Sequence, residues 1–310
     1  MNLLPYIKIA RVDHWFKNVF MLPGVLVAMY IDPSVIQGGL LWSLLLGLLA
    51  AGLVASSYYV LNEILDAEFD RLHPVKKLRP IPSGEVVLAW AWLEWIALGM
   101  LGLAVASVLG TAFFMTALVL WIMGCLYNIP PVRTKDKPYL DVLSESLNNP
   151  LRLLLGWYLT GITLWPPLSL VLSYWMIGAF FMALKRYAEF ERIGDPERAA
   201  SYRASFGHYN HERLMISVVF YVAAFGLFFG IFLIRYRIEF ILLIPFIAGF
   251  IAWYLHLTYL EDSPVQYPEQ LYKQRGFVAY SMLCGVVALL LLLWDLPFLA
   301  EFFSKTTVVN

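Results

Sequence analysis

The sequence predicts an all-α polytopic membrane protein, with about nine transmembrane helices in one bundle and a polar cavity that faces the cytoplasm. Three observations support this fold class. Hydrophobic residues make up 61% of the 310 residues and charged residues only 14%, with a mean hydropathy of +0.70, whereas a soluble domain has about a quarter charged residues. Long apolar runs recur along the chain, and the charged residues gather in a few loops.

Each apolar run is close to the roughly 20 residues that cross a bilayer as a helix. The run at 141–163 is the least regular, because Glu145, Asn148 and Arg152 interrupt it. Since the runs are joined by short loops, residues 1–310 are expected to form one membrane-embedded domain. The expected spans lie at 14–32, 38–62, 86–108, 111–128, 141–163, 167–189, 213–234, 238–258 and 276–296.

The Lys and Arg residues predict the orientation of these spans. With the N-terminus in the cytoplasm, eighteen of them fall on the cytoplasmic side, and only Arg235, Arg237 and Lys305 on the other. Cytoplasmic loops carry such an excess of Lys and Arg. We therefore expect the long polar loops, and any site they form, to face the cytoplasm. No small-residue cleavage site follows the first apolar run, which predicts a retained span, and the lack of a targeting extension favours a prokaryotic inner membrane.

The composition also argues against several classes of protein. The 22 basic and 22 acidic residues balance to zero net charge, so no basic field exists to bind nucleic acid. Cys125 and Cys284 both lie in apolar runs, which argues against a disulfide scaffold. A transporter without catalysis remains an alternative. It predicts polar residues near mid-bilayer in two matching halves, whereas here they cluster at one membrane face and no internal repeat is evident.

The densest group of acidic and basic residues follows the second apolar run. Asn62, Asp66 and Asp70 are spaced i, i+4 and i+8, and Glu63 comes three residues before Asp66. On a helix these four side chains project from one side. Carboxylate and amide oxygens are hard ligands that suit Mg²⁺. The spacing therefore predicts that Asn62, Glu63, Asp66 and Asp70 bind magnesium.

Basic residues follow this acidic motif at once. His73, Lys76, Lys77 and Arg79 supply groups that bind phosphate oxygens. Acidic side chains for a metal next to basic side chains for phosphate are what a diphosphate site needs. The alternative is an ordinary cytoplasmic loop that only sets topology, which would need the bases but not the spaced acids.

Further candidates lie near other helix ends. Lys17 either contributes to the site or extends to the membrane interface. After Pro130 and Pro131, which must end the fourth helix, Arg133 and Lys135 either bind phosphate or mark topology. Tyr127 either contacts substrate or belongs to an aromatic belt, and Arg152 either pairs with Glu145 or lines a polar cavity.

The loop after the sixth run supplies a second polar set. Lys185 and Glu189 share one helix face at the end of that run, beside Arg186. Glu189, Glu191 and Asp195 are expected to form an acidic group across the cavity from Asp66 and Asp70.

The motif Asn62-Glu63-x-x-Asp66-x-x-x-Asp70, closed by residues 79–84 (RPIPSG), resembles the first aspartate-rich motif of UbiA-type intramembrane prenyltransferases. The usual second residue of that motif is Asp, and Glu63 replaces it here. The resemblance covers nearly the whole chain and implies a magnesium-dependent transferase with a nine-helix bundle.

Further residues resemble the decaprenyl-phosphate phosphoribosyltransferase branch of this superfamily: the His73-Pro74-x-Lys76-x-x-Arg79 and Trp15-x-Lys17-Asn18 stretches, residues 185–189 (KRYAE) and Arg152. That branch uses Mg²⁺ and moves a phosphoribosyl group from phosphoribosyl pyrophosphate to a polyprenyl phosphate. The resemblance implies Asp66, Asp70, Lys185 and Glu189 as catalytic residues. It implies Lys17, Lys76, Arg79 and Lys185 as phosphate partners, and Tyr187 and Glu189 as a second polar wall. From the residue patterns and the resemblance together, the expected substrate-binding residues are Lys17, Asn62, Lys76, Lys77, Arg79, Tyr127, Arg133, Lys135, Arg152, Arg186 and Tyr187.

One region resembles other members of the superfamily. The stretch Tyr127-Asn128-x-Pro130-Pro131-x-Arg133-x-Lys135 is similar to the members that prenylate aromatic acceptors, although their DxxxD second motif is not evident. The alternative function is therefore transfer of a polyprenyl group from its diphosphate to an aromatic or other small acceptor. In both cases the expected partners are a polyprenyl lipid, a diphosphate-bearing small molecule and the surrounding membrane lipids.

Overall fold

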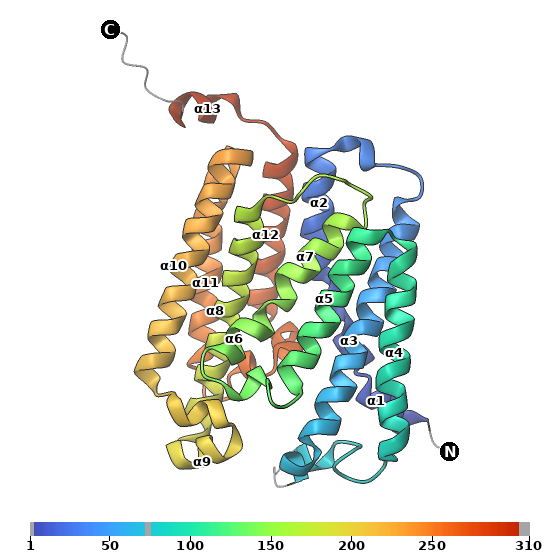
Figure 1. The fold of residues 1–310 in the computed structure, drawn as a ribbon. Coiled ribbons are helices and arrows are strands. Elements are labelled where there is room, and N and C mark those ends of the chain that lie inside the picture. Colours follow the sequence, from blue (N-terminus) through green and yellow to red (C-terminus); the bar gives the residue numbers. More distant parts are fainter. Residues whose placement is uncertain (1–2, 72–75, 304–310) are drawn as a thin grey trace. The chain divides into compact units, whose positions relative to one another are not determined.

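The computed structural model describes residues 3–71 and 76–303, and within these ranges it is helical and contains no β-strand (Figure 1). The chain divides into two compact units. The first comprises Met1–Pro166 and Asp195–Asn210, and the second comprises Pro167–Gly194 and His211–Asn310. The single domain expected from the sequence stays a prediction. His73 and Pro74 lie outside the described residues.

In the first unit, helices α3, α4 and α5 lie against one another, and α7 packs on both α2 and α5 (Figure 1). Their contacts bury an apolar core around Val54, Phe113, Leu120 and Leu155. The helices of this unit are α1 (Leu4–Ile9), α2 (Leu22–Ile31), α3 (Leu40–Arg71), α4 (Leu88–Val108), α5 (Thr111–Asn128), α6 (Leu140–Ser146), α7 (Asn148–Tyr158) and α9 (Pro196–Tyr202), with the 3₁₀ turns η1 (Val12–Met21), η2 (Pro33–Val35), η3 (Lys76–Leu78), η4 (Thr134–Asp136) and η5 (Ala204–His208).

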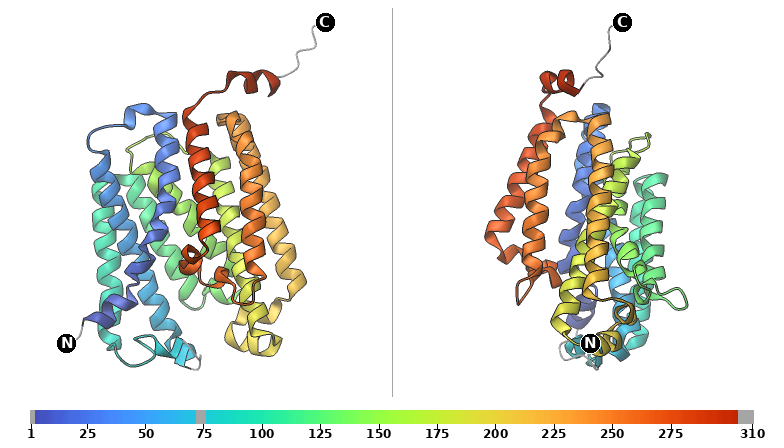
Figure 2. Two further views of the ribbon diagram at one scale, coloured as in Figure 1. Left: turned by 180° about the vertical axis from the view of Figure 1, so that it is seen from behind. Right: turned by 90° about the vertical axis from the view of Figure 1, so that its left-hand side faces the viewer.

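In the second unit, α8 packs along α10, and α11 contacts both α8 and α12 (Figure 2). Aromatic rings of Phe181, Phe250, Tyr254 and Phe277 fill the space between α8, α11 and α12. The helices of this unit are α8 (Leu168–Ile193), α10 (His211–Tyr236), α11 (Ile244–Thr258), α12 (Arg275–Leu293) and α13 (Pro297–Phe303), with the 3₁₀ turns η6 (Ile238–Leu243), η7 (Pro264–Gln266) and η8 (Pro268–Lys273).

Seven helices of the described residues are long and apolar enough to cross a membrane, so the chain is an integral, multi-pass membrane protein. They match seven of the nine expected spans. The other two runs are divided: 14–32 becomes η1 followed by α2, and 141–163 becomes α6 followed by α7. Pro23 and Pro150 stand in the first turns of α2 and α7, where a residue without an N–H is tolerated. The count of nine stays a prediction.

The two divided runs pack tightly on each other. A Cβ atom on Gly24 of α2 would lie 2.0 Å from the backbone oxygen of Leu153, and one on Gly156 of α7 would lie 1.8 Å from that of Met21. Only glycine allows backbones to approach so closely. This contact fixes α7 one turn beyond Arg152, a residue of the candidate site.

Candidate active site

The polar end of α3 meets the loop that follows α5, and Asp66 is the centre of this contact. Oδ1 of Asp66 accepts hydrogen bonds from Nζ of Lys135 at 2.5 Å and from Nη2 of Arg133 at 2.9 Å. Asp136 binds the same guanidinium through Nε at 2.7 Å. Arg133 and Lys135, predicted from the sequence as phosphate-binding residues, therefore lie directly against the predicted magnesium ligand Asp66.

Asn128, the last residue of α5, is a site residue that the sequence analysis missed. Its Oδ1 accepts from Nδ2 of Asn62 at 2.7 Å and from Nζ of Lys135 at 3.0 Å, while its own Nδ2 donates to the backbone of Gly124. Asn128 is 2% exposed, and these buried hydrogen bonds link α3, α5 and η4. Its place just before the Pro130–Pro131 stop was the signal available in the sequence.

Lys135 is an unusual lysine because it is 4% exposed. Burial disfavours the charged ammonium and lowers the pKa of Lys135 to about 8, although the neighbouring carboxylate of Asp66 opposes that shift. With a pKa of about 8, Lys135 is mostly protonated at pH 7 and pairs with Asp66 as a cation.

Glu63 and Asp70 bind the loop that returns from α3 to α4. Asp70 pairs with Nη1 of Arg79 at 2.6 Å. Glu63, 2% exposed, accepts from the backbone N–H of Ile81 at 3.2 Å and lies 3.6 Å from Nη2 of Arg11. Both carboxylates therefore fasten the loop in this structure, and the metal-binding role of Glu63 stays a prediction.

The donor set of this region fits a magnesium ion. Asp66 and Asp70 offer carboxylate oxygens, and the hydrogen bond to Asn128 uses the NH₂ group of Asn62, which leaves its Oδ1 as a possible ligand. These are hard oxygen donors, and they project from one side of α3. Across residues 3–71 and 76–303, no three His, Cys, Asp or Glu side chains form a metal-binding group by themselves. Magnesium is commonly bound by one or two carboxylates, with water and substrate phosphates as its other ligands.

Lys76 contacts a segment that is far away in the sequence. Its Nζ donates to the hydroxyl of Tyr202 at 2.6 Å. Tyr202 ends α9, whose first turn is capped by Asp195 through the backbone N–H groups of Glu197 and Arg198. Asp195 thus has a structural role at a helix start, and its place in the second acidic set stays a prediction.

Asp141 holds this same segment in place. It is fully buried and accepts from the hydroxyls of Tyr209 at 2.6 Å and Ser205 at 3.2 Å, with Arg203 at 3.6 Å. These contacts explain why residues 195–210 belong to the first unit, although they connect two helices of the second.

We expect Asp141→Asn to loosen residues 195–210. Asn keeps one acceptor oxygen but loses the charge that attracts Arg203, and a charged hydrogen-bond partner contributes about 1.5–3 kcal/mol. Tryptic cleavage after Arg198 and Arg203 should become faster, with a lower melting temperature in detergent. Asp262→Asn, at an exposed position, serves as the control and should change neither. Equal cleavage rates in all three proteins would contradict the anchoring role of Asp141.

Three other predicted residues lie within the first unit. Arg152 is 4% exposed and donates to Oδ1 of Asn18 at 3.2 Å and to the hydroxyl of Tyr58 at 3.0 Å. Tyr127 donates to Glu145 at 2.9 Å. Lys17 lies 3.4 Å from Nδ1 of His14. Arg152 therefore joins α7 to η1 and α3.

Lys77 lies in η3 of the first unit, whereas the predicted residues Lys185, Arg186, Tyr187 and Glu189 belong to the second. On α8, Glu189 pairs with Nη1 of Arg186 at 3.1 Å, and the ring of Tyr187 stacks edgewise on those of His211 and Tyr259. Glu191 pairs with His211 at 2.5 Å. The approach of Lys185 and Glu189 to Asp66 and Asp70 stays a prediction.

Comparison with known families identifies the class of protein. Residues 19–272 match the model of the UbiA prenyltransferase family. The chain therefore belongs to this family, which is a family of transferases, and the resemblance noted in its aspartate-rich motif is confirmed.

Among curated relatives, the decaprenyl-phosphate phosphoribosyltransferase of Mycolicibacterium smegmatis is 30% identical over 209 residues, which cover 64% of this chain and 63% of the relative. The enzyme of the same description from Corynebacterium glutamicum is 29% identical over 226 residues, 71% of this chain and 66% of the relative. The digeranylgeranylglyceryl phosphate synthase of Saccharolobus solfataricus is 33% identical over 130 residues, 41% of this chain and 42% of the relative. The chain thus spans a little under two thirds of the first of these relatives.

Solved structures support the fold. A UbiA homolog from Archaeoglobus fulgidus bound to GPP and Mg²⁺ has a TM-score of 0.69 and 22% identity, covering 90% of this chain and 99% of that chain. The same homolog has been solved bound to Cd²⁺, with a TM-score of 0.68 and 21% identity over 94% of this chain and 100% of that chain.

Proposed function

We propose that the chain transfers a phosphoribosyl group from phosphoribosyl pyrophosphate to a polyprenyl phosphate in a magnesium-dependent reaction. The observation that carries this proposal is the contact of Asp66 with Lys135 and Arg133, because it brings a carboxylate that is predicted to bind metal together with two cations that are predicted to bind phosphate. The choice of donor and acceptor rests on the relatives from Mycolicibacterium smegmatis and Corynebacterium glutamicum, which are named decaprenyl-phosphate phosphoribosyltransferases.

In this proposal, Lys76, Arg79 and Lys135 hold phosphate oxygens by charge-assisted hydrogen bonds. They orient the donor so that an oxygen of the lipid phosphate attacks the anomeric carbon of the ribose. The new C–O bond forms as the bond between that carbon and the diphosphate breaks, and the diphosphate leaves with its electron pair. Asn62, Asp66 and Asp70 would hold Mg²⁺, which when bound neutralises charge on the departing diphosphate.

The location of the reaction is part of the proposal. The excess of Lys and Arg in the loops that carry Lys76, Arg133 and Lys135 favours a site at the cytoplasmic face. The bacterial relatives favour an inner membrane. The polyprenyl tail would then extend into the bilayer while its phosphate meets the donor at the interface.

Prenyl transfer to an aromatic or other small acceptor is the second candidate. It is favoured by the similarity to an archaeal homolog whose structure holds GPP and Mg²⁺. Both reactions release diphosphate, so the acidic motif serves either one.

A direct assay separates the two candidates. Purified full-length protein in lipid nanodiscs is offered radiolabelled phosphoribosyl pyrophosphate with decaprenyl phosphate, and in parallel a radiolabelled prenyl diphosphate with an aromatic acceptor. Label appearing in the lipid fraction supports phosphoribosyl transfer. Label confined to a prenylated aromatic product would replace it with the second candidate, and inactivity with both pairs would contradict both.

We expect Lys76→Gln to raise the KM for phosphoribosyl pyrophosphate roughly tenfold, with a smaller effect on kcat. The loss of one charge-assisted hydrogen bond to phosphate accounts for that factor. Lys8→Gln, at an exposed lysine of α1, is the control. An unchanged KM in Lys76→Gln would favour the interpretation of residues 76–79 as a topology loop. Arg79→Gln is less clean as a test, since it also frees the buried Asp70.

A further inference from the structure

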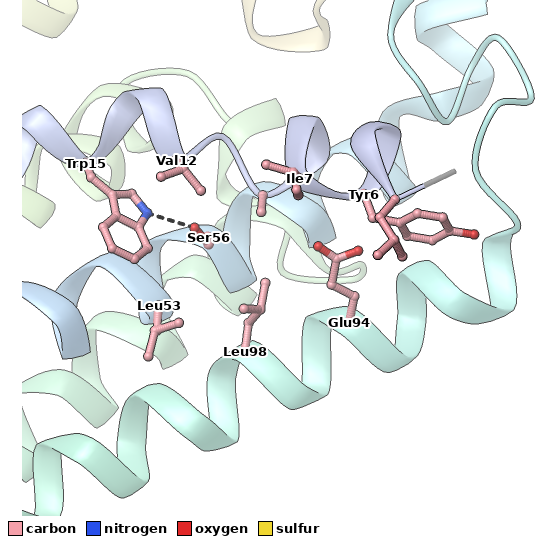
Figure 3. A pocket seen from close by; sticks show the side chains of 10 residues that line it. Tyr6, Ile7, Val12, Trp15, Leu53, Ser56, Glu94 and Leu98 are labelled. Atoms are coloured by element: carbon pink, nitrogen blue, oxygen red, sulfur yellow. Dashed lines mark hydrogen bonds between the residues drawn. The ribbon is translucent and has the colours of Figure 1, made fainter. Parts of the chain in front are cut away.

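A cavity of about 370 Å³ lies between the N-terminal segment and helices α3 and α4, away from the acidic motif. Figure 3 shows its walls: Tyr6 and Ile7 of α1, Val12 and Trp15 of η1, Leu53 and Ser56 of α3, and Glu94 and Leu98 of α4. All of these residues belong to the first unit. The walls are almost entirely apolar, and none of the described residues that line the cavity is a Lys, Arg or His.

Most polar groups of the cavity already have partners. The hydroxyl of Ser56 accepts a hydrogen bond from Nε1 of Trp15 at 2.9 Å, which is drawn in Figure 3. The hydroxyl of Tyr6 accepts from the backbone N–H of Val87 at 3.3 Å. These bonds fix the walls, and they leave the carboxyl group of Glu94 as the polar group that faces the cavity.

Glu94 lies within a membrane span. It comes six residues after the first residue of α4, which places it about 9 Å along the helix. Its Oε2 is buried and has no hydrogen-bond partner among the described residues. Acidic residues inside spans are costly and usually serve a partner or a function, and an unsatisfied buried oxygen calls for a ligand or an ion.

The short helix α1 forms one wall of the cavity. Ile9 of α1 and Ala10, which follows it, are buried with Val60, Ile64 and Ala91 of α3 and α4. Leu4 of α1 is 55% exposed, and Ile7, at the edge of the cavity, is 57% exposed. We infer that this short helix, with one face on the protein and apolar residues exposed, lies at the level of lipid headgroups. The cavity beneath it therefore opens where headgroups and the first acyl carbons are found.

We propose that this cavity binds the ammonium headgroup of an aminophospholipid, with the carboxylate of Glu94 as its acceptor. An ammonium supplies N–H donors and the charge that complements the carboxylate. An anionic headgroup would meet Glu94 without any basic residue to offset the repulsion. The volume equals that of about a dozen liquid water molecules, which suits a headgroup and its first carbons rather than a whole lipid.

This site differs in chemistry from the proposed catalytic one. The catalytic region collects basic side chains for phosphate, whereas the cavity has a carboxylate and apolar walls. The acceptor in the proposed reaction is a polyprenyl phosphate, which has no ammonium group to pair with Glu94. The cavity therefore holds a resident membrane lipid and not the substrate, and its occupancy does not depend on which group the enzyme transfers.

Native mass spectrometry of the full-length protein, released from detergent, tests the proposal. The probes are phosphatidylethanolamine and phosphatidylglycerol with identical acyl chains. We expect the first bound lipid to be phosphatidylethanolamine with a preference of roughly tenfold, the factor of one charge-assisted hydrogen bond. Glu94→Gln, which keeps the shape of the side chain but removes its charge, should abolish that preference. Glu85→Gln, at an exposed glutamate outside the cavity, should preserve it.

A second variant tests the location separately from the charge. Leu98→Trp fills the cavity and should weaken binding of the first phosphatidylethanolamine roughly tenfold while leaving Glu94 in place. Equal affinity of the wild type for the two lipids, or an undiminished preference in Glu94→Gln, would overturn the proposal. Because these readouts are independent of turnover, they remain valid whatever the transferase assay shows.

Discussion

Asp66→Asn is expected to reduce magnesium-dependent turnover by a factor of roughly a hundred to a thousand, the range seen when one electrostatic contact to a developing anion is lost. The substituted amide would keep an oxygen for Lys135 and Arg133 but would lose the charge that draws a divalent cation. The folded structure should persist, because the side chain retains its shape. Turnover is measured in nanodiscs across a magnesium titration, and chelation of the metal should abolish wild-type activity.

Asp136→Asn is the matched control. Asp136 binds the same Arg133 through Nε at 2.7 Å, so its replacement disturbs the same guanidinium without touching a proposed metal ligand. Its side chain is 40% exposed, against 22% for Asp66, and an exposed ion pair contributes little. We expect turnover within a few-fold of the wild type. Comparable losses in both variants would mean that Asp66 acts by positioning Arg133 and not through magnesium.

Local features of the sequence were enough to predict much of the fold. The apolar runs identified seven spans because a lipid environment demands about 20 apolar residues and internally bonded backbone. The Pro130–Pro131 pair predicted the end of α5, which ends at Asn128. The i, i+4, i+8 spacing placed Asp66 and Asp70 on one side of α3 because that helix continues to Arg71.

Contacts between distant segments could not be predicted in the same way. The sequence places Asn128 and Asp141 at the ends of expected spans, and only the fold shows that Asn128 meets Asn62 and that Asp141 meets Tyr209. The division of the first run after Met21 was also missed, since hydropathy counts apolar residues and ignores 3₁₀ geometry. Whether Lys185 and Glu189 complete the site is also a question of contact between distant segments, and it stays a prediction.

The crossing of α2 and α7 was missed as well, because a glycine inside an apolar run does not reveal which backbone it faces. Met21 and Leu155 of the same layer are fully buried, so the surroundings have no space into which an added methyl group could move. The crossing also sets the distance between Asn18 and Arg152, which are hydrogen-bonded at 3.2 Å. A change in this crossing would therefore affect the position of Arg152 in the candidate site as well as the stability of the protein.

Gly156→Ala is expected to destabilise the protein by roughly 3 kcal/mol, the upper part of the range for overpacking. The new Cβ would stand 1.8 Å from the backbone oxygen of Met21, and a backbone atom cannot rotate away as a flexible side chain can. The helices must separate, which also strains the bond between Arg152 and Asn18. Gly226→Ala is the control: no atom lies within 4 Å of its added Cβ, and alanine favours the helix by about 1 kcal/mol. Melting curves in detergent should therefore shift in opposite directions, and a Gly156→Ala protein as stable as the wild type would refute the close crossing.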